Sequence, residues 1–314
     1  VAAHQRHFLE REFGKNRADR LQPVMQEAYR LAYIRKPEFM GNTRTEEKDP
    51  KFKVISDLPW SEQEINERLA AYRQLSDKVE QEWHALPAQK KETYFQLVKY
   101  PVQAAAQMNN KLLTAQLARH GKADWADSDR AYDSIVSLTK TYNTTKWNRM
   151  MDFQPRRLLV FNRVERKALS SGLLEKPQAV YTWNGADCVE GASVICEGLG
   201  YEGKAVAVEK KKELTFEFAA WETDSVEVEV RLLPNHPVEG ERLRFTISLD
   251  GSATEAVSYE TKGRSEEWKE NVLCNQAVRR MILPVARKAS HRLIFTALDE
   301  GVVLDQIYLY TPRI

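Results

Sequence analysis

The feature that most constrains this chain is a change in the spacing of its apolar residues near Pro177. Before that point apolar residues recur every three and four positions, as on one face of a helix, and after it they alternate with polar residues, as in strands. The chain has 314 residues, and single hydrophobic cores rarely grow beyond about 250 residues. The sequence therefore predicts two domains of different class: a helical bundle over residues 1–165, a linker over 166–176 and a β domain over 177–314.

Several signals predict helices in the first half. Residues 1–13 and 18–34 have helical spacing. Ser61 and the glutamate three positions later form a capping-box pattern directly before an apolar stripe, which predicts a helix start. Pro101 lies inside the next predicted helix, where it removes one hydrogen bond and predicts a kink. Another helix is predicted to begin near Asp127. Long helices with short connections favour an antiparallel bundle.

Short alternating segments in the second half predict strands, with VEVEV at 226–230 as the clearest case. No helix of crossover length lies between them, which favours a jelly-roll-like β-sandwich over a parallel sheet. The fold class predicted for the whole chain is therefore α+β, multidomain. An apolar run at 158–161 is too long for a free linker, so we expect the segment 158–176 to lie against the sandwich. The predicted strands are 205–208, 214–218, 226–232, 243–249, 277–283, 291–297 and 302–310.

Composition excludes several classes of partner. The 47 basic and 45 acidic residues are spread along the chain, so no basic patch for nucleic acid is visible. No apolar run approaches the roughly 20 residues needed to cross a bilayer. Cys188, Cys196 and Cys274 cannot all pair within one chain, and we interpret them as free or core thiols. A bridge between Cys188 and Cys196 stays an alternative for an exported protein.

The beginning of the chain has a helical pattern with no capping residue and no initiator methionine before it. We expect that the chain is the carboxy-terminal part of a longer protein and that an active site lies upstream of Val1.

Candidate chemical sites in the chain are few. His4 and His7 share a helix face but have no third ligand nearby, so no metal site is predicted. Glu266 and Glu267 lie directly before Trp268, which suggests an acid, a base and a sugar platform, but a solvated loop is the better interpretation. No nucleophile elbow, phosphate loop, dinucleotide turn or zinc-protease motif is present. The sequence therefore predicts no catalytic residue and no cofactor in this chain.

The aromatic residues of the β half are the remaining candidates, because flat rings stack on sugars. The same residue types also fill sandwich cores. We expect Trp183 and Trp221 to be structural and Trp268 to be exposed. The predicted carbohydrate-binding residues are Trp268, Tyr259 and Tyr201.

Long stretches of the chain resemble glycoside hydrolase family 115, the xylan α-glucuronidases. YFQLVKYPVQAAAQMNNKLL (94–113) and KWNRMMDFQPR (146–156) resemble the helical region that follows the family's catalytic barrel. LLPNHPVEGERLRFTISLDG (232–251), EEWKENVLCNQ (266–276) and the closing HRLIFTALDEGVVLDQIYLY (291–310) resemble its terminal β-sandwich.

The resemblance implies an inverting enzyme that removes α-1,2-linked glucuronic acid or its 4-O-methyl ether from xylan. The family's catalytic groups belong to an amino-terminal domain and a (β/α)8 barrel, so no catalytic residue is carried onto this sequence and the chain is predicted to be inactive alone. Implied partners are glucuronoxylan or a related glycan, the amino-terminal catalytic region and a second copy in a homodimer. Xylan as substrate implies an extracytoplasmic location. At the sequence positions of residues 153–157, other members of the family have a histidine-containing segment. The alternative is a non-enzymatic carbohydrate-binding or scaffold protein.

Overall fold

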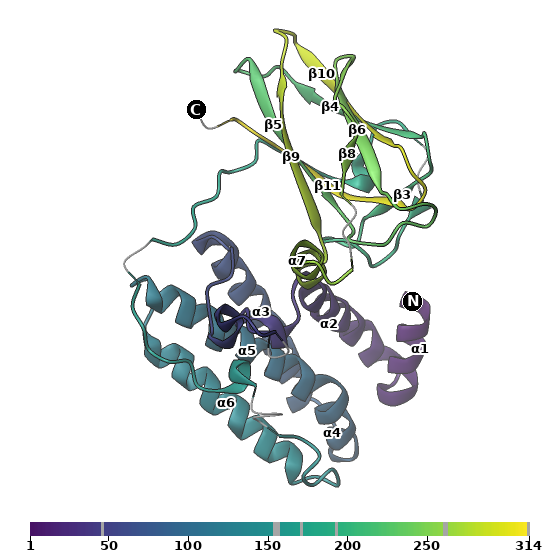
Figure 1. The fold of residues 1–314 in the computed structure, drawn as a ribbon. Helices are drawn as coiled ribbons and strands as arrows, with labels where there is room; N and C mark the ends of the chain where they lie inside the picture. Colours follow the sequence, from purple (N-terminus) through teal and green to yellow (C-terminus); the bar gives the residue numbers. More distant parts are fainter. Residues whose placement is uncertain (45–46, 153–157, 170–171, 192–193, 260–262, 313–314) are drawn as a thin grey trace. The chain divides into compact units, whose positions relative to one another are not determined.

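The computed structural model describes residues 1–44, 47–152, 158–169, 172–191, 194–259 and 263–312 (Figure 1). The chain divides into two compact units, Val1–Lys176 and Pro177–Ile314. The first unit consists of helices, and the second contains two antiparallel sheets. The predicted order of a helical region followed by a sandwich-like β region is confirmed.

The helices of the first unit begin and end close to where the sequence predicts. The capping box at Ser61 is confirmed, since its Oγ accepts from the backbone N of Glu64 at 3.3 Å and its own N donates to the Glu64 carboxylate at 2.7 Å. Asp124 caps the sixth helix through the backbone N of Ala126 at 2.9 Å. The helices are α1 (Ala2–Phe13), α2 (Lys15–Ile34), α3 (Glu62–His84), α4 (Ala88–Tyr94), α5 (Tyr100–Arg119) and α6 (Trp125–Asn143).

The irregularity predicted at Pro101 is a change of helix type. A π-helical turn, Phe95–Lys99, joins α4 to α5, and Pro101 occupies the first turn of α5. Pro101 has no amide hydrogen to continue the i to i−4 ladder, and directly before it the hydrogen bonding changes to the i to i−5 pattern of the π turn.

The apolar stripe of α3 serves two separate clusters of the helical core. Ile65 packs in the cluster that contains Met108 and Leu112, whereas Tyr72 and Val79 pack in the cluster to which all of α1 to α5 contribute. A third cluster surrounds Phe95, Tyr100 and Tyr142. One helix therefore connects two parts of the bundle.

The segment after α6 belongs to the helical core. Val160 and Val164 are 1% and 5% exposed, and both lie in the cluster around Met108. We expected the segment 158–176 to lie against the sandwich; the structure corrects this, because Val160 and Val164 are buried in the helical core and Leu158, Phe161 and Leu173 pack against it. Lys111 on α5 secures the segment by donating from Nζ to the carbonyls of Val160 at 2.5 Å and Asn162 at 2.8 Å.

The second unit consists of two sheets. One has the order β2-β3-β11-β5-β9, with β1 also paired to β11. The other has the order β4-β10-β6-β7, with β8 paired to β6. All seven predicted strands are confirmed within a residue or two. The strands are β1 (Tyr181–Asn184), β2 (Val194–Ile195), β3 (Val206–Val208), β4 (Glu213–Ala219), β5 (Ser225–Leu232), β6 (Arg244–Leu249), β7 (Ser252–Ala253), β8 (Val257–Ser258), β9 (Ala277–Pro284), β10 (Ser290–Ala297) and β11 (Val302–Tyr310).

A single apolar core lies between the sheets. Val226, Val228 and Val230 of β5 are completely buried, while the residues between them point to the opposite face. Phe245 and Phe295 stack from neighbouring strands with ring centroids 5.1 Å apart. The alternation that predicted these strands is therefore the alternation between core and outer face.

The sequence analysis missed a short helix, α7 (Glu266–Cys274). We favoured a solvated loop there. Ser265 caps this helix by accepting from the backbone N of Trp268 at 3.1 Å, and Asn275 ends it in a left-handed conformation with φ 51°. Glu266 and Glu267 lie in its first turn, where acidic side chains favour a helix start.

Candidate functional site

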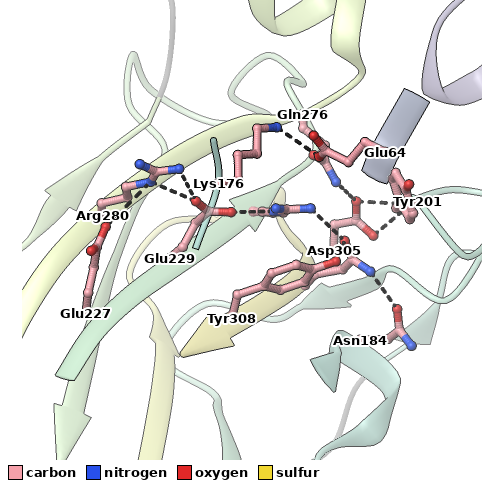
Figure 2. Close-up of polar contacts among 12 residues, drawn as sticks. Glu64, Lys176, Asn184, Tyr201, Glu227, Glu229, Gln276, Arg280, Asp305 and Tyr308 are labelled. Carbon is pink, nitrogen blue, oxygen red and sulfur yellow. Dashed lines mark hydrogen bonds and ion pairs between the residues drawn. The ribbon is translucent and has the colours of Figure 1, made fainter. Parts of the chain in front are cut away.

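The most organised polar site of the second unit centres on Asp305, at an irregularity of β11. The register of β11 against β5 shifts between Leu304 and Gln306, which turns Asp305 away from the regular ladder. Its carboxylate is 1% exposed and accepts from the backbone N of Tyr201 at 3.0 and 3.1 Å and from Nε2 of Gln276 at 2.8 Å (Figure 2). Burial raises the pKa of Asp305 above its ordinary value, although these hydrogen bonds favour the charged form.

A glycine makes this arrangement possible. Gly200 has φ +92°, and a Cβ there would lie 2.3 Å from Oδ1 of Asp305. A side chain at this position would be both strained and in collision with the carboxylate. The close approach brings the amide of Tyr201 onto Asp305, so the loop before β3 is fixed to β11.

A second network, of charged side chains, lies on the outer face of the sheet that contains β11. The Glu229 carboxylate on β5 accepts from Nε of Arg231 at 2.6 Å and from Nε of Arg280 on β9 at 2.7 Å (Figure 2). Burial alone would raise the pKa of Glu229, but the charges and hydrogen bonds of the two arginines outweigh it and lower the pKa. The Arg231 guanidinium lies 3.8 Å from the ring centroid of Tyr308, whose hydroxyl donates to Gln306 at 3.3 Å.

These networks are suited to holding strands and loops together rather than to chemistry on a substrate. Asp305 and Glu229 are each 1% exposed, so neither oxygen pair meets a molecule in solution. A general acid near neutral pH needs a raised pKa, which Glu229 lacks. Within the described ranges, no group of three or more His, Cys, Asp or Glu residues is placed to hold a metal ion. No helix among those described has the length and apolarity of a membrane span.

The structure places the predicted sugar-binding residues in different surroundings. Trp268 on α7 is partly exposed and stacks on His236, with ring centroids 6.2 Å apart and planes at 20°. Tyr201 is partly exposed, and its backbone is held by Asp305. Tyr259 is 1% exposed and packs in the core near Phe245, which leaves no ring face for a sugar. Trp183 and Trp221 both pack against the core and are partly buried.

The histidines, the acidic pair and the cysteines named in the sequence analysis lie in ordinary surface or structural positions. His4 and His7 are exposed on α1. Glu267 forms an ion pair with Arg279 at 2.6 Å. The three cysteines all lie in described segments, and none is bridged to another. The segment 153–157, where other members of the family have a histidine-containing segment, lies outside the described residues.

The Glu229 network was missed because charged residues that alternate along a strand are usually solvated. The network depends on Glu229 lying directly across from Arg280 on the neighbouring strand. The sequence alone does not give this strand pairing.

Comparison with known proteins relates the chain to glycoside hydrolases. Residues 192–314 match the model of the glycosyl hydrolase family 115 C-terminal domain. The solved structure of BtGH115A, a family GH115 4-O-methyl-α-glucuronidase with specificity for decorated arabinogalactans, is 61% identical and superposes with a TM-score of 0.96 over 99% of this chain. The chain spans 42% of that protein. Among curated protein sequences, none matches.

Weaker similarities involve carbohydrate-binding modules. A family 35 module from an environmental isolate is 10% identical, with a TM-score of 0.34 over 42% of this chain and 93% of the module. A family 35 module from Clostridium thermocellum is 11% identical, with a TM-score of 0.33 over 42% of this chain and 98% of the module. Similarities at this level support no argument about this chain.

Proposed function

Because the chain belongs to glycoside hydrolase family 115, as its carboxy-terminal helical and β-sandwich part, we propose that it supports the catalytic region of an α-glucuronidase. The observation that carries this proposal is the 61% identity to BtGH115A over 99% of the chain. The buried Asp305 and Glu229 networks suit a supporting role, since they order strands and loops and expose no reactive carboxyl group.

The proposed reaction of the whole protein is the removal of glucuronic acid, or its 4-O-methyl ether, from a decorated polysaccharide. An inverting mechanism needs one carboxylic acid to protonate the leaving oxygen and one carboxylate to activate water, about 6.5 to 9.5 Å apart. We place both groups in the amino-terminal catalytic region. The sequence resemblance implies xylan as the polymer, whereas BtGH115A has specificity for decorated arabinogalactans. We propose arabinogalactan as the first polymer to test and glucuronoxylan as the second.

Further parts of the proposal concern partners and location. Trp268 is the best placed of the sequence-predicted residues to contact a glycan, because its ring is partly exposed on α7, with Tyr201 second. The polymers named above are extracellular, so we propose an extracytoplasmic protein. A homodimer is proposed from the family alone.

The test is an assay of the full-length protein on both polymers, with free 4-O-methylglucuronic acid measured by chromatography and the product's first-formed anomer by NMR. We expect release from at least one polymer, with inversion of configuration. Binding to either polymer without any release would reject the enzyme and support a non-enzymatic carbohydrate-binding protein.

A further inference from the structure

Two loops at one end of the sandwich line a half-open cavity that has no role in the proposed function. The loop Ala220–Asp224 follows β4 and leads to β5 in the other sheet, and the loop Val285–Ala289 follows β9 and leads to β10 in the other sheet. The backbone N of Val285 donates to the carbonyl of Asp224 at 2.8 Å, which ties the loops together. The cavity between them has a volume of about 490 Å³, a size suited to one or two sugar rings.

One wall of the cavity is the side chain of Trp221. The ring packs edge-on against Phe218 of the core, with centroids 5.8 Å apart and planes at 84°. Its Nε1 donates to Oγ1 of Thr223 and to the carbonyl of Ser225, both at 2.9 Å. The ring is therefore fixed in orientation before any ligand arrives, yet it stays partly exposed and lines the cavity. A fixed indole face is a suitable platform for the apolar face of a pyranose ring.

The other walls carry charged groups of both signs. Arg287 and Lys288 lie on one loop, and Glu222 and Asp224 on the other. Lys288 is 3.5 Å from the Asp250 carboxylate and is 49% exposed. For Arg287, which is exposed, the described part of the chain provides no ion-pair partner. Its guanidinium is thus available to a carboxylate from outside, which it binds with two parallel hydrogen bonds.

We infer that this cavity binds a uronic acid residue of a saccharide, with the ring stacked on Trp221 and the carboxylate on Arg287. The carboxylates of Glu222 and Asp224 accept hydrogen bonds from the sugar hydroxyls, and Lys288 adds positive charge beside the guanidinium. The site is non-catalytic. The choice of a glucuronic acid as the uronic acid rests on the proposed function, but the geometry requires only a pyranose ring that carries a carboxylate.

The test measures binding and uses no catalysis, so its failure differs from a failure of the proposed function. Methyl α-D-glucuronide and methyl α-D-glucoside, which differ only in the carboxylate, are titrated into this chain at pH 7 while tryptophan fluorescence or NMR shifts are followed. We expect weak saturable binding of the glucuronide, with the glucoside at least about tenfold weaker because it lacks the charge-assisted pair.

Two variants identify the site. Arg287→Ala should weaken glucuronide binding about tenfold, and because the side chain is exposed the melting temperature should stay unchanged. Arg242→Ala removes an exposed arginine that lines a different cavity and serves as the matched control, with unchanged binding expected. Trp221→Phe keeps an aromatic ring and should weaken both ligands by a smaller factor. Equal binding of the two sugars, no saturable binding, or binding unaffected by Arg287→Ala would each overturn the inference.

Discussion

The two units of the chain place their buried ionisable side chains in different positions. The helical unit buries basic side chains inside its core: Lys111 is 0% exposed and Arg68 is 6% exposed. The sandwich unit has one apolar core and places its buried charges, such as Glu229, on the outer face of a sheet. Both units have apolar cores, but in the bundle buried basic side chains also join distant segments inside that core.

Arg68 is an example of a buried basic side chain in the helical unit. It lies on the buried face of α3 and donates to Oδ1 of Asn109 at 2.7 Å and to the carbonyl of Arg35 at 2.9 Å. Through these bonds one side chain connects α3, α5 and the end of α2. Buried charges that lose a partner destabilise strongly, so such contacts specify which helices pack together.

The largest expected effect is the loss of apolar volume from the sandwich core. Phe216→Ala should lower the free energy of unfolding of the second unit by about 3 to 5 kcal/mol, because Phe216 is completely buried. Ile282→Ala on β9 is the control, since Ile282 is 64% exposed, and it should change stability by less than about 1 kcal/mol. Urea unfolding measures both. Similar losses for the two variants would contradict a core that depends on apolar volume.

The second-largest expected effect comes from alanine substitutions at two glycines. Their comparison distinguishes the cost of backbone strain from the cost of a steric collision. Gly200→Ala adds a Cβ 2.3 Å from Asp305 at a positive φ, whereas Gly251→Ala adds one at φ +93° with nothing within 4 Å. We expect Gly251→Ala to cost about 1 to 2 kcal/mol from strain alone and Gly200→Ala to cost roughly twice as much. Equal melting temperatures for the two variants would show that the contact with Asp305 contributes nothing.

The third effect concerns the buried lysine of the helical unit. Burial lowers the pKa of Lys111 to about 7, while an unfolded lysine titrates near about 10.4. Between these pH values the unfolded chain binds more protons, so this group makes stability rise with pH, by about 1.4 kcal/mol per pH unit. The contribution of Lys111 to the free energy of unfolding is greatest above the pKa of a lysine in the unfolded chain. It falls as the pH drops to 7.

Urea unfolding of the helical unit at pH 7, 8 and 9 checks this dependence. Lys111→Met should remove the rise with pH that the unmodified chain shows. Lys140→Met, at an exposed lysine on α6, is the control and should keep the rise. An identical pH profile for all three proteins would mean that Lys111 titrates as an exposed lysine does.

The smallest effect is at the helix cap. Ser61→Ala should cost about 1 kcal/mol, because the backbone N of Glu64 loses its capping oxygen. Ser61→Asp keeps an acceptor at the cap and should restore most of the stability. A change in melting temperature for the first unit that is the same in both variants would argue against capping as the cause.

Local patterns predicted the regular elements well. The valines of β5 and the cap at Ser61 determine structure within a few residues of themselves, so the sequence was enough to place them. The helix α7 was missed because it is short and depends on its caps, Ser265 and Asn275. A short charged segment gives the same sequence pattern as a solvated loop.

The sites were predicted less well because their contacts are distant in sequence. Asp305 meets Tyr201 from 104 positions away, and Lys111 meets Val160 from 49 positions away. A lysine in the middle of a helix looks exposed until its acceptors are known. The segment after α6 was assigned to the wrong partner for the same reason, since an apolar run does not reveal which core it enters.

The central claim, that this chain supports a glycoside hydrolase without performing its chemistry, is tested most directly by assaying the pure chain on arabinogalactan and glucuronoxylan. Free 4-O-methylglucuronic acid is measured by chromatography, with the full-length protein as the positive control. We predict no release above the blank, because general acid and general base must meet at one glycosidic bond and we propose that both belong to the amino-terminal catalytic region. Turnover by the chain alone, abolished by a substitution within it, would contradict the account.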